Sequence, residues 1–126
     1  MGDGGNEVRS YQDLDVWKGS MELAAQIYRA TDGFPREELY GLTSQLRRAA
    51  VSVPSNIAEG HTRASTGEFL HHLSIAHGSL SELVTQLLLA RRLEFVASNR
   101  VTGLLQEAER IGRMLRGLRQ SLARHI

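Results

Sequence analysis

Four long segments repeat apolar residues every three or four positions, which is the period of an α-helix, and this repeat most constrains the fold. They cover roughly residues 14–31, 42–60, 66–92 and 98–122, and none shows the alternation typical of a half-buried strand. Each segment has one apolar face, and the links between segments are short. The sequence therefore predicts an all-α protein, an antiparallel up-down-up-down four-helix bundle.

Several polar residues stand where these helices should begin. Asp13 is placed to cap the first helix, and Ser98 or Asn99 the fourth. Ser65 and Glu68 have the spacing of a capping box, which is the clearest helix start in the chain. These residues predict three of the four helix starts.

Pro54 lies inside the second predicted helix. A proline there removes one backbone donor and crowds the carbonyl of Ala50, one turn earlier. We therefore expect the second helix to be kinked at Pro54.

The 126 residues suit a single domain. Residues 1–12 are glycine-rich and polar and are predicted to form a disordered N-terminal tail, which leaves residues 13–126 for the bundle. The chain has no cysteine, no apolar run of roughly 20 residues and no apolar stretch typical of a signal peptide. We expect a soluble, cytoplasmic protein that does not contact the membrane.

One segment is more distinctive than the periodicity. Residues 40–60 read YGLTSQLRRAAVSVPSNIAEG, and residues 14–17, 34–35 and 76–83 add LDVW, FP and AHGSLSEL. This pattern resembles the four-helix-bundle family encoded in intervening sequences of 23S rRNA genes, to which accessory proteins of diversity-generating retroelements are related. The resemblance extends from about Tyr11 to Leu122, nearly the whole predicted bundle.

The resemblance implies a four-helix bundle that assembles into a ring-like homopentamer. Members from the retroelements bind nucleic acid and a reverse transcriptase through a basic surface, whereas those from rRNA genes have no established biochemical role. Val51 and Leu88 are apolar positions that a single bundle would leave uncovered, which is consistent with assembly. We expect the chain to bind copies of itself.

Polar residues recur at helical spacing next to the apolar faces of the second and third helices. They are Gln45, Arg48, Ser52, Asn56, Glu59, Ser79, Glu82 and Gln86. Because buried polar groups must be hydrogen-bonded, we expect the two stripes to pair with each other. Two interpretations stay open: a satisfied polar layer that sets helix register, or a ligand pocket or subunit interface.

The sequence predicts no metal site, no cofactor and no enzymatic activity. Glu68 and His71 form a Glu-x-x-His motif, but di-iron bundles need this motif on two helices and it occurs once here. His72 and His77 are five residues apart and so lie on different faces of a helix. No nucleophile stands beside a base in the polar stripes.

The last predicted helix is rich in arginine. Residues 100–126 contain six arginines and two glutamates. The candidate nucleic-acid-binding residues are Arg110, Arg113, Arg116, Arg119 and Arg124. Repeated around a ring, such a face would attract phosphate groups. No aromatic residue lies among these arginines, so we expect binding through backbone charge with little sequence selectivity. The alternative is an ordinary solvated helix face.

Two hypotheses of function follow. The first is a self-assembling, homopentameric, non-catalytic module that engages RNA, DNA or a nucleoprotein partner through arginine-rich surfaces. The second is an assembly or scaffold protein that binds only itself and another protein. Phe34 and Phe95 lie in links between helices, where they either mark a subunit contact or staple the neighbouring helices.

Overall fold

The computed structural model describes residues 10–124, and within that range it contains helices and no strand. The elements in chain order are η2 (Tyr11–Asp13), α1 (Asp15–Thr31), η3 (Arg36–Glu38), α2 (Leu42–His61), α3 (Thr66–Arg92) and α4 (Ser98–Ala123). The predicted all-α four-helix bundle is confirmed. None of the described helices is long and apolar enough to cross a membrane.

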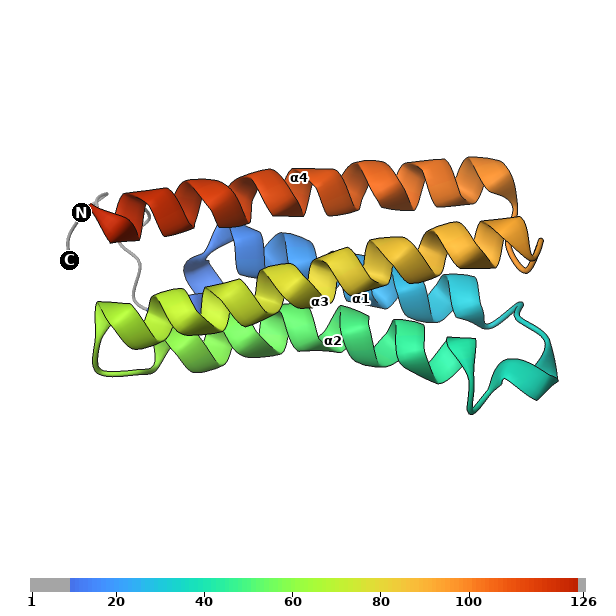
Figure 1. Cartoon of the computed structure of the whole chain (residues 1–126), viewed down its shortest axis with the longest axis horizontal. Helices are drawn as coiled ribbons and strands as arrows, with labels where there is room; N and C mark the ends of the chain where they lie inside the picture. The colour runs from blue at the N-terminus through green and yellow to red at the C-terminus, as the bar shows by residue number, and fades with distance from the viewer. Residues whose placement is uncertain (1–9, 125–126) are drawn as a thin grey trace.

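Consecutive helices run in opposite directions along one long axis (Figure 1). Each long helix packs against the next one in the chain, and α1 also packs against α4, which closes the bundle. The α2–α3 contact is the most extensive of these. The α1–α2 and α3–α4 links therefore lie at one end of the bundle, and the α2–α3 link lies at the other end (Figure 1).

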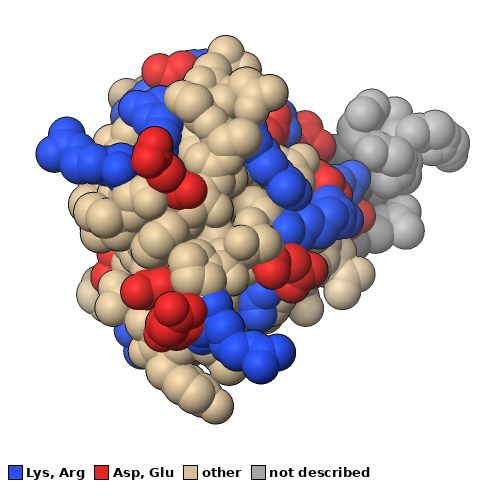
Figure 2. Space-filling view, turned by 90° about the vertical axis from the view of Figure 1, so that its right-hand side faces the viewer, with Lys and Arg blue, Asp and Glu red and all other residues tan. Residues whose placement is uncertain are grey.

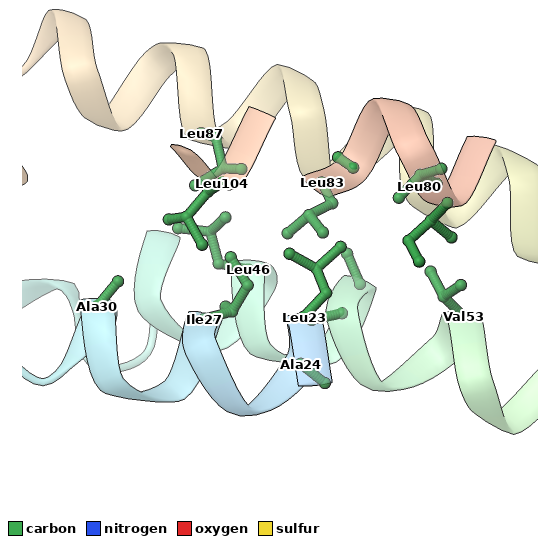
Figure 3. Packing of buried hydrophobic residues seen from close by; sticks show 14 of the residues in the cluster. Leu23, Ala24, Ile27, Ala30, Leu46, Val53, Leu80, Leu83, Leu87 and Leu104 are labelled. Carbon is green, nitrogen blue, oxygen red and sulfur yellow. The ribbon is translucent and has the colours of Figure 1, made fainter. Parts of the chain in front are cut away.

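The core runs along the bundle axis and contains side chains from every long helix. Figure 3 shows Leu23 and Ile27 of α1 and Leu46 of α2 pointing toward Leu83 and Leu87 of α3. All five side chains are buried. Burying a side chain of this size stabilises the fold by about 1.5–3 kcal/mol, so the apolar stripes account for the bundle.

The Ser65 cap is confirmed: its Oγ accepts a hydrogen bond from the backbone N–H of Glu68 at 3.1 Å. The reciprocal half of the predicted capping box is different, because the Glu68 carboxylate accepts from the Ser65 hydroxyl and not from its backbone N–H. The predicted cap at Asp13 is wrong. Leu14 occupies the N-cap position of α1 without a side-chain hydrogen bond, and the Asp13 carboxylate instead accepts from the Ser10 N–H at 3.3 Å. Asp13 thus closes the short η2 turn that precedes α1.

The predicted start of α4 is also wrong, by one residue or two. Ala97 is the N-cap, with no side-chain hydrogen bond, and Ser98 and Asn99 already lie inside the helix. The Ser98 carbonyl accepts from the Thr102 hydroxyl at 3.1 Å. The first turn of α4 begins without a polar side chain as its cap.

α2 is unbroken from Leu42 to His61, with Pro54 buried inside it. The missing donor of Pro54 costs one hydrogen bond, but the buried side chains on either side keep the helix in the bundle. The kink at Pro54 stays a prediction.

Residues 1–9 and 125–126 lie outside the described residues, and so does most of the predicted disordered tail. Residues 10–12, the end of that tail, belong to the capped η2 turn. The Tyr11 ring packs edge-on against Trp17 of α1, with centroids 5.4 Å apart. Residues 10–12 therefore form a capped turn, where a disordered tail was predicted.

Candidate functional site

The five candidate arginines of α4 fall into two groups. Arg110 and Arg113 form ion pairs within the helix, with Glu107 at 3.0 Å and Glu109 at 3.2 Å. These pairs have the three- and four-residue spacing that places side chains side by side on a helix. Most of the positive charge of Arg110 and Arg113 is therefore balanced locally.

Arg116, Arg119 and Arg124 follow the last glutamate of the helix and form no ion pair with any residue in the range 10–124. Arg119 instead approaches His77 of α3, with 3.2 Å between its Nη1 and the imidazole Nδ1. A guanidinium group can only donate, so Nδ1 accepts and the ring proton of His77 is on Nε2. The unbalanced charge of α4 is thus concentrated toward its C-terminal end.

The charge of His77 depends on this neighbourhood. Its burial and, next, the guanidinium groups of Arg119 and Arg116 lower the pKa of His77 below the ordinary value of 6.5. His77 is therefore neutral near pH 7 and does not add to the positive charge of the cluster.

A groove of about 810 Å³ runs between α3 and α4, and the described residues that line it belong to these two helices. His77 and Arg116 belong to its wall, and Leu80, Val84 and Leu105 are among its apolar residues. A smaller hollow of about 320 Å³ is lined by Arg116, Arg119, Gln120 and Ala123. Arg116 thus borders both spaces.

The polar stripes of α2 and α3 meet as predicted, but only in part. Ser52 and Ser79 share a hydrogen bond of 2.8 Å between their hydroxyl oxygens. Asn56 donates to the Ser52 carbonyl at 2.9 Å, and its Oδ1 lies 3.2 Å from Nδ1 of His72. We call Ser52, Asn56, His72 and Ser79 the polar seam. It is a half-buried layer whose members are joined by hydrogen bonds.

Sequence reasoning missed His72 as a member of the seam. The signal was available, because His72 precedes Ser79 by seven residues, two helical turns, and therefore lies on the same face of α3. An imidazole at that position presents a nitrogen to the Asn56 amide, which completes the layer.

The other polar candidates lie outside the seam. Gln45, Arg48 and Glu82 are exposed. Glu59 pairs with Arg63 at 2.6 Å, and its Oε1 lies 4.0 Å from Nδ1 of His72 at the edge of the seam. Gln86 is buried, and its Oε1 has no hydrogen-bond partner among the described residues. The structure therefore brings together two of the five α2 candidates with one residue from the α3 stripe.

The residues considered for metal binding do not converge. The Glu68 carboxylate accepts from the Ser65 hydroxyl at 3.2 Å, and His71 is exposed. Within residues 10–124, no three His, Asp or Glu side chains come close enough together to hold a metal ion. His77 faces α4, away from the His72 side of α3.

Phe34 and Phe95, the phenylalanines in the links between helices, pack against each other and so staple the two links together. Phe34 is buried and its ring packs against Phe95 with centroids 5.6 Å apart, which joins the α1–α2 link to the α3–α4 link. Figure 2 shows this end of the bundle, where acidic and basic side chains are interspersed around uncharged residues. Among the described residues, the charges visible at this end are therefore mixed in sign.

Apolar and aromatic side chains are exposed on the side of η3 and α2. Tyr40 is 92% exposed and Val51 42%, and both line a hollow of about 650 Å³ together with Tyr28 and Leu39. On α3, Leu88 is 41% exposed. The predicted exposure of Val51 and Leu88 is thus observed in the single chain.

The fold and these surfaces define a class: a four-helix bundle with a basic helix end, exposed apolar residues and an internal polar seam. The model of one protein family, described as 23S rRNA-intervening sequence protein, matches residues 12–117 of this chain. The chain belongs to this family, and the predicted resemblance is confirmed. Arg119 and Arg124 lie beyond the matched range.

Among solved structures, the chain is similar to a protein with unknown function from the S23 ribosomal protein family of Bacteroides thetaiotaomicron. The TM-score is 0.78, the match covers 83% of this chain and 95% of that chain, and 23% of the residues are identical. At this identity the similarity supports the fold alone. No curated protein matches the sequence. Neither the description of the family nor that of the solved structure names a catalytic activity.

Proposed function

We propose that the protein is a self-assembling, non-catalytic module that binds the phosphate backbone of nucleic acid through the C-terminal part of α4. The observation that carries the proposal is the separation of the arginines into two groups. Arg110 and Arg113 are balanced by glutamates, whereas Arg116, Arg119 and Arg124 have no acidic partner among the described residues.

Unpaired guanidinium groups suit phosphate because their fixed fork of donors matches its oxygens. An arginine already paired with a carboxylate must give up that contact first, so it gains less from a phosphate. One bundle offers only a few such contacts. Assembly into a homopentamer, which the family resemblance implies, would repeat the cluster five times and strengthen the field that attracts a polyanion.

The test compares two double variants of equal charge change, Arg116→Gln with Arg119→Gln and Arg110→Gln with Arg113→Gln. Retention of labelled single-stranded RNA and DNA is measured over a salt series. We expect affinity to fall with salt, and the first variant to lower the slope of log affinity against log salt by about 1.4 per binding chain. The second variant should change it much less.

Absent binding, or affinity that does not depend on salt, would contradict the proposal. Equal losses in the two variants would show that net charge, rather than the unpaired arginines, controls binding. For assembly, sedimentation equilibrium should give five times the chain mass of 14.0 kDa. A monomer mass at micromolar concentration would exclude the pentamer.

One observation favours a second candidate, a scaffold protein that binds itself and another protein without nucleic acid. Tyr40, Leu39 and Val51 are exposed around the hollow beside α2, and aromatic residues next to arginine are typical of protein–protein contacts. Pull-down from a native extract that recovers a protein partner, with no nucleic acid, would favour this candidate.

A further inference from the structure

Where α3 contacts α4, His77 lies beside Arg116 and Arg119, although only the arginines were candidates from the sequence. We propose that His77, Arg116 and Arg119 form a binding site for a tetrahedral oxyanion, and that the anion binds together with a proton on His77. The identification of this anion as a backbone phosphate rests on the proposed function. The site itself rests on the geometry of the three side chains.

The hydrogen bond between Arg119 and His77 indicates the protonation state of the His77 ring in this arrangement. Nδ1 of His77 accepts from Arg119 at 3.2 Å, which requires a neutral ring. A proton on Nδ1 would remove this hydrogen bond and place a third positive charge beside two guanidinium groups. An oxyanion between the three groups would favour the protonated ring of His77, because the two guanidinium groups and the imidazolium would then each donate a hydrogen bond to one of its oxygens.

The surroundings leave the cluster open to an anion. The hollow of about 320 Å³ lies against Arg116 and Arg119, and the groove of about 810 Å³ lies against His77 and Arg116. Glu109 is the acidic residue of this groove, and it pairs with Arg113 at 3.2 Å. Among the described residues of α4, the cations Arg116 and Arg119 are the charged groups that act on His77, whereas α2 packs on the side of α3 where His72 meets Asn56.

A proton taken up with the anion makes binding depend on pH. The neighbouring cations and burial lower the pKa of His77 in the free protein, and a bound anion would raise it. Affinity should therefore increase as pH falls from the higher pKa to the lower one. Each whole pH unit between the two pKa values corresponds to about a tenfold gain in affinity.

The test follows the imidazole signals of His77 by nuclear magnetic resonance between about pH 5 and pH 8, where histidine titrates. The signals are assigned with His77→Gln, and the titration is repeated with sulfate and with a short RNA oligonucleotide. Sulfate keeps its charge over this range, as does the phosphodiester backbone. We expect both anions to raise the pKa of His77.

Three variants test whether the pKa rise belongs to this site. His77→Gln keeps an acceptor for Arg119 but cannot titrate, so its anion affinity should lose the dependence on pH. Arg116→Gln with Arg119→Gln should abolish the pKa rise, whereas Arg110→Gln with Arg113→Gln should retain it. A rise that persists without Arg116 and Arg119 would overturn the proposal.

Comparing sulfate with RNA distinguishes a failure of the oxyanion site from a failure of the proposed function. A rise with RNA alone supports the site and indicates that its ligand is a polymer backbone. A rise with sulfate, in a protein that does not retain nucleic acid, supports the oxyanion site and contradicts the proposed function. An unchanged pKa of His77 with both anions overturns the site, even where RNA is retained.

Discussion

Replacing Gly60 by alanine tests how closely α2 and α3 pack. A Cβ atom at residue 60 would lie 2.7 Å from the Cβ of His72, 3.0 Å from Cδ1 of Phe69 and 3.3 Å from the Phe69 carbonyl oxygen. Two of these neighbours are the base of a side chain and the backbone, so they move only with α3 itself. Such overpacking typically costs about 1–3 kcal/mol.

The same substitution at Gly78 is the matched control. Gly78 lies within α3, and a Cβ there would meet no atom within 4 Å. Alanine is favoured over glycine in a helix by about 0.5–1 kcal/mol, and at Gly78 nothing opposes this gain. At Gly60 the same gain offsets part of the overpacking cost, which leaves a net loss of up to about 2.5 kcal/mol.

The assay is equilibrium urea unfolding followed by circular dichroism at one fixed protein concentration, because assembly makes apparent stability depend on concentration. We expect Gly60→Ala to lower the free energy of unfolding and Gly78→Ala to raise it. Gly19→Ala should fall between them, since its closest contact, at 2.7 Å, is Cδ1 at the far end of the Ile111 side chain rather than backbone. A Gly60→Ala protein as stable as the parent would refute the reasoning about α2–α3 packing.

Three further predictions concern stability. Arg47→Ala removes a 2.8 Å hydrogen bond to the buried Thr31 hydroxyl and a guanidinium stacked 4.6 Å from the Tyr28 ring, and should cost about 1–3 kcal/mol in urea unfolding. Asn56→Ala breaks the polar seam and should cost about 1–3 kcal/mol, whereas Ser55→Ala, at an exposed neighbour, should be nearly neutral. The lowered pKa of His77 means that the unfolded chain binds its proton more readily, so this residue should reduce stability as pH falls through 6.5 toward the pKa of the folded protein. Thermal unfolding of parent and His77→Gln at several pH values checks this: the variant should lose less stability on acidification.

The fold could be predicted from the sequence because each helix carries its own apolar stripe. Leu46 and Leu83, for example, lie on stripes read from spacing alone, and both are buried. The helix starts were less accessible. Ser65 bonds the Glu68 N–H as its spacing predicts, but α4 begins at Ser98, after an N-cap residue, Ala97, whose side chain cannot accept a hydrogen bond, so no polar residue marks this start.

The candidate site was predicted only in part. The pairing of Arg110 and Arg113 could have been read from the chain, because Glu107 and Glu109 precede them by three and four residues. The contact of Arg119 with His77 could not. It spans 42 positions and depends on the register of α4 against α3, which no local pattern specifies.

The Phe34–Phe95 staple bears on how the chain divides into halves. It joins the two links at one end of the bundle, so a cut between α2 and α3, near residues 62–65, would leave two helical hairpins, each with an intact link and one ring of the staple. The buried stripes and the seam would also remain complementary across the cut. Such fragments should therefore associate and fold into the bundle when they are produced together.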